Sequence, residues 1–244
     1  MISSLSKKYD YLILFGVILL NLAVWSQTSR KLPEWANVPV APSITTATAT
    51  FLGDKELAYR SLALTLQSFG NLTGRVKALQ DYNYDNLATW FWLSDGLNPK
   101  SNYVPFLASY YFSGSQDPSK LRPLIEYLRH VGKQPEPEKW RHLGQAVYLA
   151  NHKLKDTQLA LELADELALT YKPNTGMPAW PLQMKAIIAS GIGEKEMAYN
   201  LLVDIIKSKQ SDLDPAEINY MLDQICNNIL TAEQKIKDPL CQIN

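Results

Sequence analysis

The sequence predicts an all-α protein in which antiparallel helical hairpins are stacked behind a single N-terminal apolar helix. One observation is a phrase that occurs twice, at residues 52–59 (LGDKELAY) and at residues 192–199 (IGEKEMAY). In both copies a glycine, which allows a left-handed backbone at a helix end, precedes an acidic residue that can cap the next helix. A second observation is that apolar residues recur at helical spacing, and no long segment alternates with period two. A recurring helix-turn-helix joint is typical of stacked hairpins, none of which can bury its apolar face alone.

Composition narrows the classes of function. The 244 residues are 46% hydrophobic and formally neutral, which suits one folded domain after the N-terminal segment. Beyond Lys31 the acidic residues slightly outnumber the basic ones, which argues against a nucleic-acid partner. The chain has three histidines and two cysteines without a Cys-x-x-Cys or His-Glu-x-x-His motif, so we expect no metal site and no cofactor.

The N-terminal segment predicts a membrane anchor. Residues 11–25 read YLILFGVILLNLAVW, with two lysines before them and a basic pair after them. With its flanks this stretch approaches the ~17 to 25 residues that a bilayer requires, so we expect a transmembrane helix over residues 9–27 behind a cytoplasmic tail of residues 1–8. A cleaved signal peptide is the alternative, although residues 24–26 (VWS) match the small-x-small cleavage pattern poorly. The basic residues favour a cytoplasmic N-terminus and a periplasmic, or otherwise extracytoplasmic, C-terminal domain.

A proline-rich stretch follows the anchor. Residues 28–44 contain Pro33, Pro39 and Pro42. Because proline removes a backbone donor and favours extended conformations, this stretch predicts a semi-stiff spacer before a helical domain over residues 45–230.

Glycine, proline and capping residues delimit the helices of this domain. An apolar stripe predicts a helix over residues 57–66, and Asp85 can cap another that runs to Leu97. The later helices are expected over residues 103–112, 117–128, 137–149, 156–169, 178–189, 194–208 and 214–230, and a short helix over residues 231–236 begins a C-terminal tail of residues 231–244.

The expected second helices of the hairpins begin 31, 32, 39 and 38 residues apart. Residues 140–144 read WRHLG, and Ala160 and Pro173 follow at a later helix and its end. In this spacing, and in the Trp-x-x-Leu-Gly, Ala and Pro positions, the chain resembles the tetratricopeptide repeat family, whose period is ~34 residues. The resemblance covers roughly residues 45–230 and implies a solenoid with a concave surface lined by the first helix of each hairpin.

The same resemblance implies a binding function without a catalytic group. The concave positions of the family map to Tyr111, Arg141, Gln145, Tyr148 and Gln183. Tyrosine and arginine are frequent interface anchors, so we expect a scaffold or adaptor whose partners are proteins of a membrane or envelope complex. The alternative for the two tyrosines is packing between repeats.

The sequence favours catalysis less. It has no Gly-x-Ser-x-Gly, phosphate-loop or dinucleotide motif, so we expect the protein not to be an enzyme. The enzymatic alternative is a hydrolase acting on an envelope polymer, with a cleft among Trp90, Trp92 and Tyr110. A third possibility is a structural subunit of a membrane machine, whose N-terminal helix packs on other helices through the polar Asn21.

The two cysteines predict a disulfide. Cys226 lies on an expected helix, and Cys241 lies in the tail, which can turn back along the last hairpin. An even cysteine count in an extracytoplasmic domain favours pairing. Two unpaired thiols are the alternative, and a cytoplasmic location of the domain would favour them.

Overall fold

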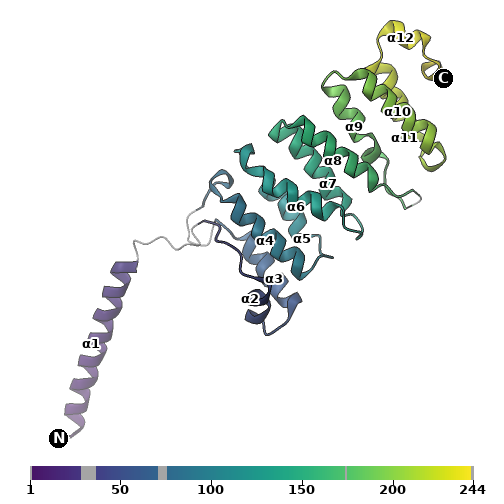
Figure 1. Cartoon of the computed structure of the whole chain (residues 1–244). Helices are drawn as coiled ribbons and strands as arrows, with labels where there is room; N and C mark the ends of the chain where they lie inside the picture. The colour runs from purple at the N-terminus through teal and green to yellow at the C-terminus, as the bar shows by residue number, and fades with distance from the viewer. Residues whose placement is uncertain (1, 29–36, 71–75, 174, 243–244) are drawn as a thin grey trace.

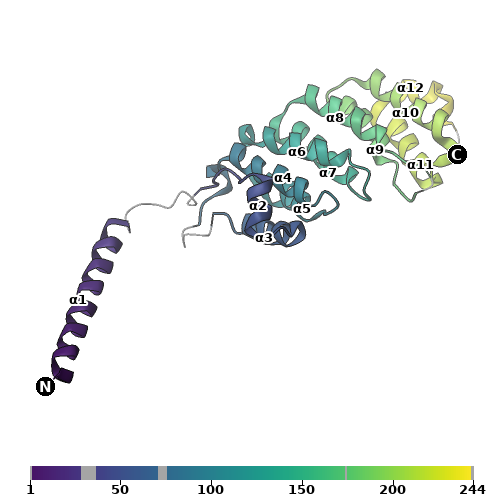
Figure 2. The same ribbon diagram turned by 60° about the horizontal axis from the view of Figure 1, so that its bottom comes forward.

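The regular elements of this protein are helices. The computed structural model describes residues 2–28, 37–70, 76–173 and 175–242, and these ranges contain helices and turns but no strand. The all-α prediction is therefore confirmed. Figures 1 and 2 show α2 to α12 following one another along one direction, from the N-terminal end of the helical body to the C-terminus.

The helices begin and end as follows. The α-helices are α1 (Ile2–Thr28), α2 (Ile44–Thr50), α3 (Lys55–Gln67), α4 (Tyr84–Leu97), α5 (Tyr103–Phe106), α6 (Arg122–Gly132), α7 (Trp140–Tyr148), α8 (Thr157–Leu169), α9 (Trp180–Gly191), α10 (Lys195–Lys209), α11 (Pro215–Asp223) and α12 (Ala232–Lys237). Three π-helical turns continue α5, α7 and α11: η3 (Leu107–Tyr111), η6 (Leu149–Leu154) and η8 (Gln224–Ile229). The 3-10 turns are η2 (Leu79–Asp81), η4 (Phe112–Gly114), η5 (Pro118–Leu121), η7 (Gln210–Asp212) and η9 (Pro239–Cys241).

The apolar N-terminal segment forms α1, which lies apart from the other helices in Figure 1. Its side chains from Tyr11 to Gln27 are exposed. Among the described residues, none of the helices combines the length and the apolar character that crossing a membrane requires. The structure therefore gives no support to the transmembrane helix predicted over residues 9–27.

Part of the predicted spacer belongs to the folded body. Residues 37–42 form no helix and lie along α4, and Val38 is buried in the core. The Trp90 indole Nε1 donates a hydrogen bond to the Pro39 carbonyl at 2.7 Å, and the Asn86 amide donates to the Val38 carbonyl at 2.9 Å. The spacer prediction is thus wrong for residues 37–42, because their backbone is hydrogen-bonded to one helix. The earlier part of the spacer, with Pro33, lies outside the described residues.

Consecutive helices pack against one another from α6 to α10, and α4 packs on both α3 and α6. Two glycines permit the close approach. A β-carbon at Gly132, the last residue of α6, would lie 2.6 Å from the Leu143 backbone nitrogen of α7. A β-carbon at Gly144 would lie 2.6 Å from the ring of Trp180, which begins α9. Gly132 therefore makes room for Leu143 of the Trp-x-x-Leu-Gly sequence, and Gly144 of that sequence makes room for Trp180.

The repeated phrase forms two similar joints, α2 to α3 and α9 to α10. Gly53 and Gly193 have φ angles of 88° and 89°, the left-handed conformation that glycine adopts without strain. The side chain of Asp54 caps α3 by accepting hydrogen bonds from the backbone at residues 56 and 57. Glu194 makes no side-chain cap on α10, since glutamate is longer than the residues that cap best. The glycine part of the prediction holds for both joints, and the capping part holds only for the first.

Several expected helix starts differ from the structure, and two of the differences have a clear local cause. The N-cap of α4 is Asn83, whose side chain accepts from the Asn86 backbone at 3.0 Å, so Asp85 lies inside the helix. The helix expected from residue 137 begins only at Trp140, because Glu138 adopts a left-handed φ of 69° that a helix does not contain.

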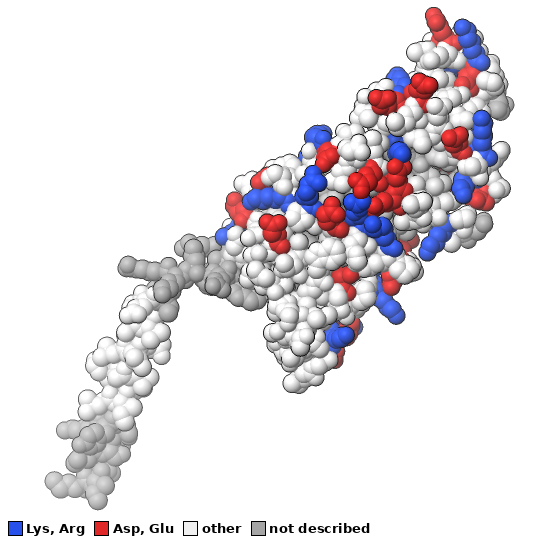
Figure 3. Space-filling model, viewed as in Figure 1, with Lys and Arg blue, Asp and Glu red and all other residues white. Residues whose placement is uncertain are grey.

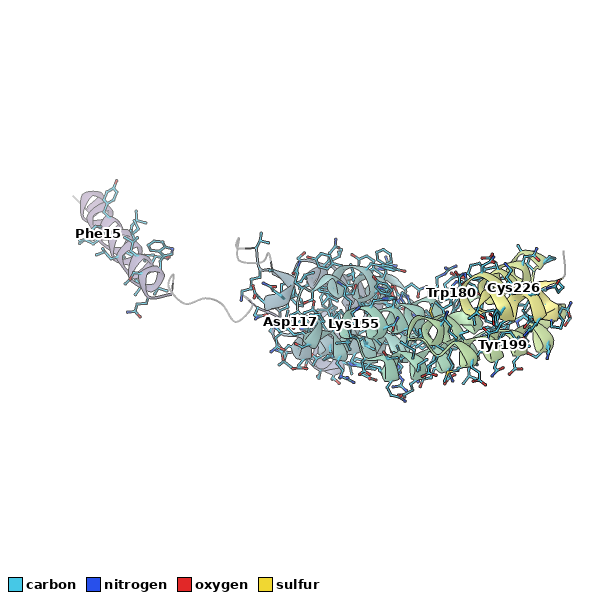
Figure 4. The ribbon with its side chains drawn as sticks, turned by 90° about the horizontal axis from the view of Figure 1, so that it is seen from above. Phe15, Asp117, Lys155, Trp180, Tyr199 and Cys226 are labelled. Carbon is cyan, nitrogen blue, oxygen red and sulfur yellow. A yellow bond between two sulfur atoms is a disulfide. The ribbon has the colours of Figure 1, made fainter. Side chains whose placement is uncertain are left out.

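A folded-back tail covers the C-terminal end of the body. Cys226 of η8 and Cys241 of η9 are joined by a disulfide with a Cα–Cα distance of 5.7 Å. Leu240 packs against the apolar cluster formed by α9, α10, α11 and η8. The Tyr199 hydroxyl donates to the Asp238 carboxylate at 2.7 Å, so the tail is also tied to α10. Figure 4 shows Tyr199 and Cys226 at this end of the chain.

Candidate partner-binding face

The residues predicted to line a concave surface have different environments. Tyr148 is 47% exposed, Arg141 is also exposed, and Gln145 is half-buried. Tyr111 is exposed but packs on Phe112 of the next turn, with ring centroids 4.9 Å apart. Gln183 is a correction, because it is only 3% exposed on the inner side of α9 and presents no surface to a partner.

Two pairs of aromatic rings lie on neighbouring helical segments, α5 with η3 and α7 with η6. Phe106 and Tyr110, on α5 and η3, are 54% and 57% exposed, and their ring centroids are 4.9 Å apart. Tyr148 and His152, on α7 and η6, are exposed with ring centroids 4.8 Å apart. Gln145 lies one turn before Tyr148. We call these five residues the aromatic face.

A hydrogen bond brings the two halves of the aromatic face together. The Gln145 side-chain amide donates to the Ser109 carbonyl at 3.1 Å, and Ser109 directly precedes Tyr110. Below the surface, Ser109 Oγ and His142 Nδ1 are 2.9 Å apart. Burial, and then the nearby charge of Lys139, lower the pKa of His142 to about 4. His142 is therefore neutral at pH 7 and links the two helices as an uncharged hydrogen-bonding group.

Lys139 is a buried cation under the start of α7. It has no exposed surface, and its ammonium donates to the Ser101 carbonyl at 2.7 Å. Ser101 Oγ also accepts a hydrogen bond from the Tyr59 hydroxyl at 2.6 Å. Burial lowers the pKa of Lys139, whereas the negative charges of Asp95 and Glu136 raise it. The hydrogen bond from Lys139 to Ser101 joins the start of α7 to the connection between α4 and α5. It therefore helps to fix the position of α7, which carries part of the aromatic face.

A network of ion pairs among the described residues joins α6 and α8. Arg129 of α6 bonds to Glu162 and Glu166 of α8, and Lys133 lies 3.3 Å from Glu166. The hydrogen bond from Arg129 holds the pKa of Glu166 below its usual range. Figure 3 shows acidic and basic side chains mixed in a band over α6 and α8. The surface of α6 and α8 thus carries both signs of charge and differs from the aromatic face.

A cavity of about 810 Å³ lies between the α6–α7 and α8–α9 connections. Trp140, Leu169 and Met177 line it together with several charged residues, of which Glu166 is already paired with Arg129. In the described part of the chain, no group of three or more His, Cys, Asp or Glu residues could hold a metal ion.

The aromatics considered for a catalytic cleft do not line this cavity. Trp90 is 2% exposed, and its indole nitrogen bonds to Pro39. Trp92 is partly exposed, with its ring on Tyr127 and His130. Tyr110 belongs to the aromatic face.

Sequence reasoning missed Phe106 and His152 as members of this face. The available signal was the pairing of aromatic rings at i and i+4, which places Phe106 with Tyr110 and Tyr148 with His152 on one side of a helix. It was not decisive because buried and exposed aromatic stripes have the same spacing.

By fold, the chain belongs to the class of all-α proteins whose helices pack one after another along the chain. It matches no protein-family model, none of the curated proteins and no solved structure with which it was compared.

Proposed function

We propose that this protein is a scaffold whose helical body, a tetratricopeptide-like solenoid, holds a protein partner on the aromatic face while α1 attaches it to a membrane. The exposure of the two ring pairs carries the binding part of the proposal. Aromatic side chains give large contact areas at low entropic cost and are enriched among residues that dominate binding energy. Here they lie on two helices held together by one buried and one partly buried hydrogen bond, so the face is pre-organised.

Attachment through α1 is supported by the surface of this helix. From Tyr11 to Gln27 its side chains are exposed and none of them is charged. Covering such a surface stabilises the covered state by about 25 cal/mol per Å² of apolar area, and the apolar part of a membrane provides that cover. Trp25 suits the boundary between lipid and water.

The proposal places the helical body outside the cytoplasm, with partners in a membrane or envelope complex. Lys7 and Lys8 precede the apolar stretch, which favours a cytoplasmic N-terminus. The Cys226–Cys241 disulfide fits an oxidising compartment.

Fractionation tests the attachment. We expect the full-length protein in the membrane fraction, and release by detergent but not by high salt or alkaline carbonate. A form lacking residues 1–28 is expected to be soluble. A full-length protein that stays soluble without detergent contradicts membrane attachment.

Site-specific crosslinking tests the binding face. A photoreactive amino acid at Tyr148 is expected to crosslink one partner in native membranes. Tyr220 of α11 is the matched control, because it is the same residue type with the same 47% exposure. Tyr148→Ala should abolish co-purification of that partner while changing the free energy of unfolding by no more than ~0.5 kcal/mol. Equal crosslinking from both positions, or a large loss of stability, would contradict a binding role.

A further inference from the structure

Residues 37–42 show how a helix of this protein holds a polypeptide backbone. Asn86, Thr89 and Trp90 project from one side of α4 at i, i+3 and i+4. The amide of Asn86 and the indole of Trp90 donate to backbone carbonyls, and the Thr89 hydroxyl accepts from the Ala41 backbone nitrogen at 2.9 Å. An amide, a hydroxyl and an aromatic donor therefore bind a non-helical, proline-containing segment without any charged group.

The aromatic face presents the same chemical set. Gln145 and Tyr148 stand at i and i+3 on α7, and together they supply an amide, an aromatic ring and a hydroxyl. Phe106 and Tyr110 add a second pair of rings on the neighbouring helix. Unlike Trp90, these aromatic side chains are exposed. Aromatic surfaces recognise polyproline-type segments, whose backbone is already extended and whose carbonyls accept hydrogen bonds.

The charged residues near the aromatic face indicate the charge of the ligand. Residues 101–116 contain no charged residue, and residues 139–155 contain lysine and arginine but no aspartate or glutamate. Lys155 and Arg141 are exposed within the second range, and Arg141 pairs with Glu138, which directly precedes that range. Because the helical segments that carry the aromatic face lack carboxylates, they attract a partner that bears them and disfavour a cationic one.

We propose that the aromatic face binds an extended, proline-containing segment of a partner polypeptide that carries carboxylates and lacks lysine and arginine. This inference rests on the proposed scaffold function and names the chemistry of its partner. The rings pack against the proline side chains, and the tyrosine hydroxyls and the side-chain oxygen of Gln145, whose amide donates to Ser109, bond to the ligand backbone. Lys153 and Lys155, at the end of η6, attract its carboxylates.

Three labelled peptides of equal length test the proposal by fluorescence anisotropy with the full-length protein in detergent. The first alternates proline and glutamate, the second replaces glutamate with lysine, and the third replaces proline with glycine. We expect the first peptide to bind at micromolar concentration and each of the others to bind at least about tenfold more weakly.

Two variants and a control locate the binding. Tyr148→Ala and Phe106→Ala should each weaken binding of the proline–glutamate peptide about tenfold, whereas Tyr220→Ala should leave it unchanged. Using two exposed positions keeps the test valid if one variant folds poorly, which circular dichroism detects. Equal binding of the three peptides, or binding insensitive to both substitutions, overturns the proposal.

The crosslinking experiment separates this inference from the scaffold function. If Tyr148 captures a partner in membranes but the proline–glutamate peptide does not bind, the scaffold function stands and the ligand chemistry is wrong. If neither the capture nor the peptide responds to Tyr148→Ala, both are wrong.

Discussion

Gly144 and Trp180 are packed so closely that a β-carbon on residue 144 would lie 2.6 Å from Cη2 of the tryptophan ring. The contact joins α7 to α9. Trp180 also contacts Trp140, with ring centroids 5.2 Å apart. Gly144, the glycine of the WRHLG sequence, therefore has no side chain where the Trp180 ring packs.

Gly144→Ala should destabilise the protein. The added methyl group must displace a large packed ring, and over-packing of this kind costs about 1–3 kcal/mol. Chemical denaturation of wild type and variant measures the difference in free energy of unfolding. Gly191→Ala is the control, since a β-carbon there meets nothing within 4 Å, and we expect it to change stability by less than ~1 kcal/mol. Equal effects of the two substitutions would show that the ring moves away without cost.

The two copies of the repeated joint should respond differently to loss of their acidic residue. Asp54→Ala removes the side chain that caps α3 at 2.9 and 3.0 Å, so we expect a loss of about 1 kcal/mol. Glu194→Ala removes no cap, and its effect should stay within ~0.5 kcal/mol. Asp54→Asn should retain most of the stability because asparagine also caps well. A loss at Glu194 as large as that at Asp54 would contradict this assignment of the cap.

The sequence predicts the turns between helices more reliably than the extent and type of the helices themselves. Gly53 and Gly193 could be assigned because a left-handed turn between helices strongly favours glycine. The helix expected over residues 103–112 is instead divided among α5, η3 and η4. Apolar spacing does not reveal such π and 3-10 turns, because they depend on how neighbouring helices pack.

The binding face could be predicted only in part, for a related reason. Tyr148 and Gln183 were both placed by alignment to repeat positions, yet Tyr148 is exposed and Gln183 is buried. Which side of a helix stays exposed depends on the rotation of that helix against two neighbours. The 3.6-residue period shows which side chains share one side of a helix, but it does not show which neighbouring helix that side faces. The sequence did not predict that residues 37–42 pack on α4. A proline-rich segment can pack on a helix or link two parts of a chain without packing, and its composition is the same in both cases.

The buried histidine predicts a pH dependence of stability. Its folded pKa of about 4 lies below the value near 6.5 that an unfolded histidine has. The unfolded chain therefore binds more protons between these values, and the free energy of unfolding falls as the pH falls through this window. From His142 alone we expect a loss of about 2 kcal/mol between pH 7 and pH 5.

Two substitutions isolate this contribution. His142→Gln keeps a hydrogen-bonding group beside Ser109 but does not titrate, so its stability should depend less steeply on pH than that of wild type. His152→Gln changes an exposed ring and should leave the wild-type slope in place. Denaturation at several pH values gives the slopes, and identical slopes for wild type and His142→Gln would exclude His142 as the titrating group.

The disulfide should stabilise the C-terminal end of the body. Cys226 and Cys241 are 15 residues apart, and closing a loop of that length contributes about 3 kcal/mol in the chain-entropy model. Reduction of the wild-type protein tests this without altering packing, and it should lower the free energy of unfolding and increase hydrogen exchange in α12. Tyr199→Phe is the control, because it removes the bond to Asp238 but leaves the loop closed, so we expect a loss of only about 1 kcal/mol. Alkylation of unreduced, denatured protein from cells should find no free thiol. Two free thiols would show that the bond does not form in the cell, and the placement of the body in an oxidising compartment would lose its support.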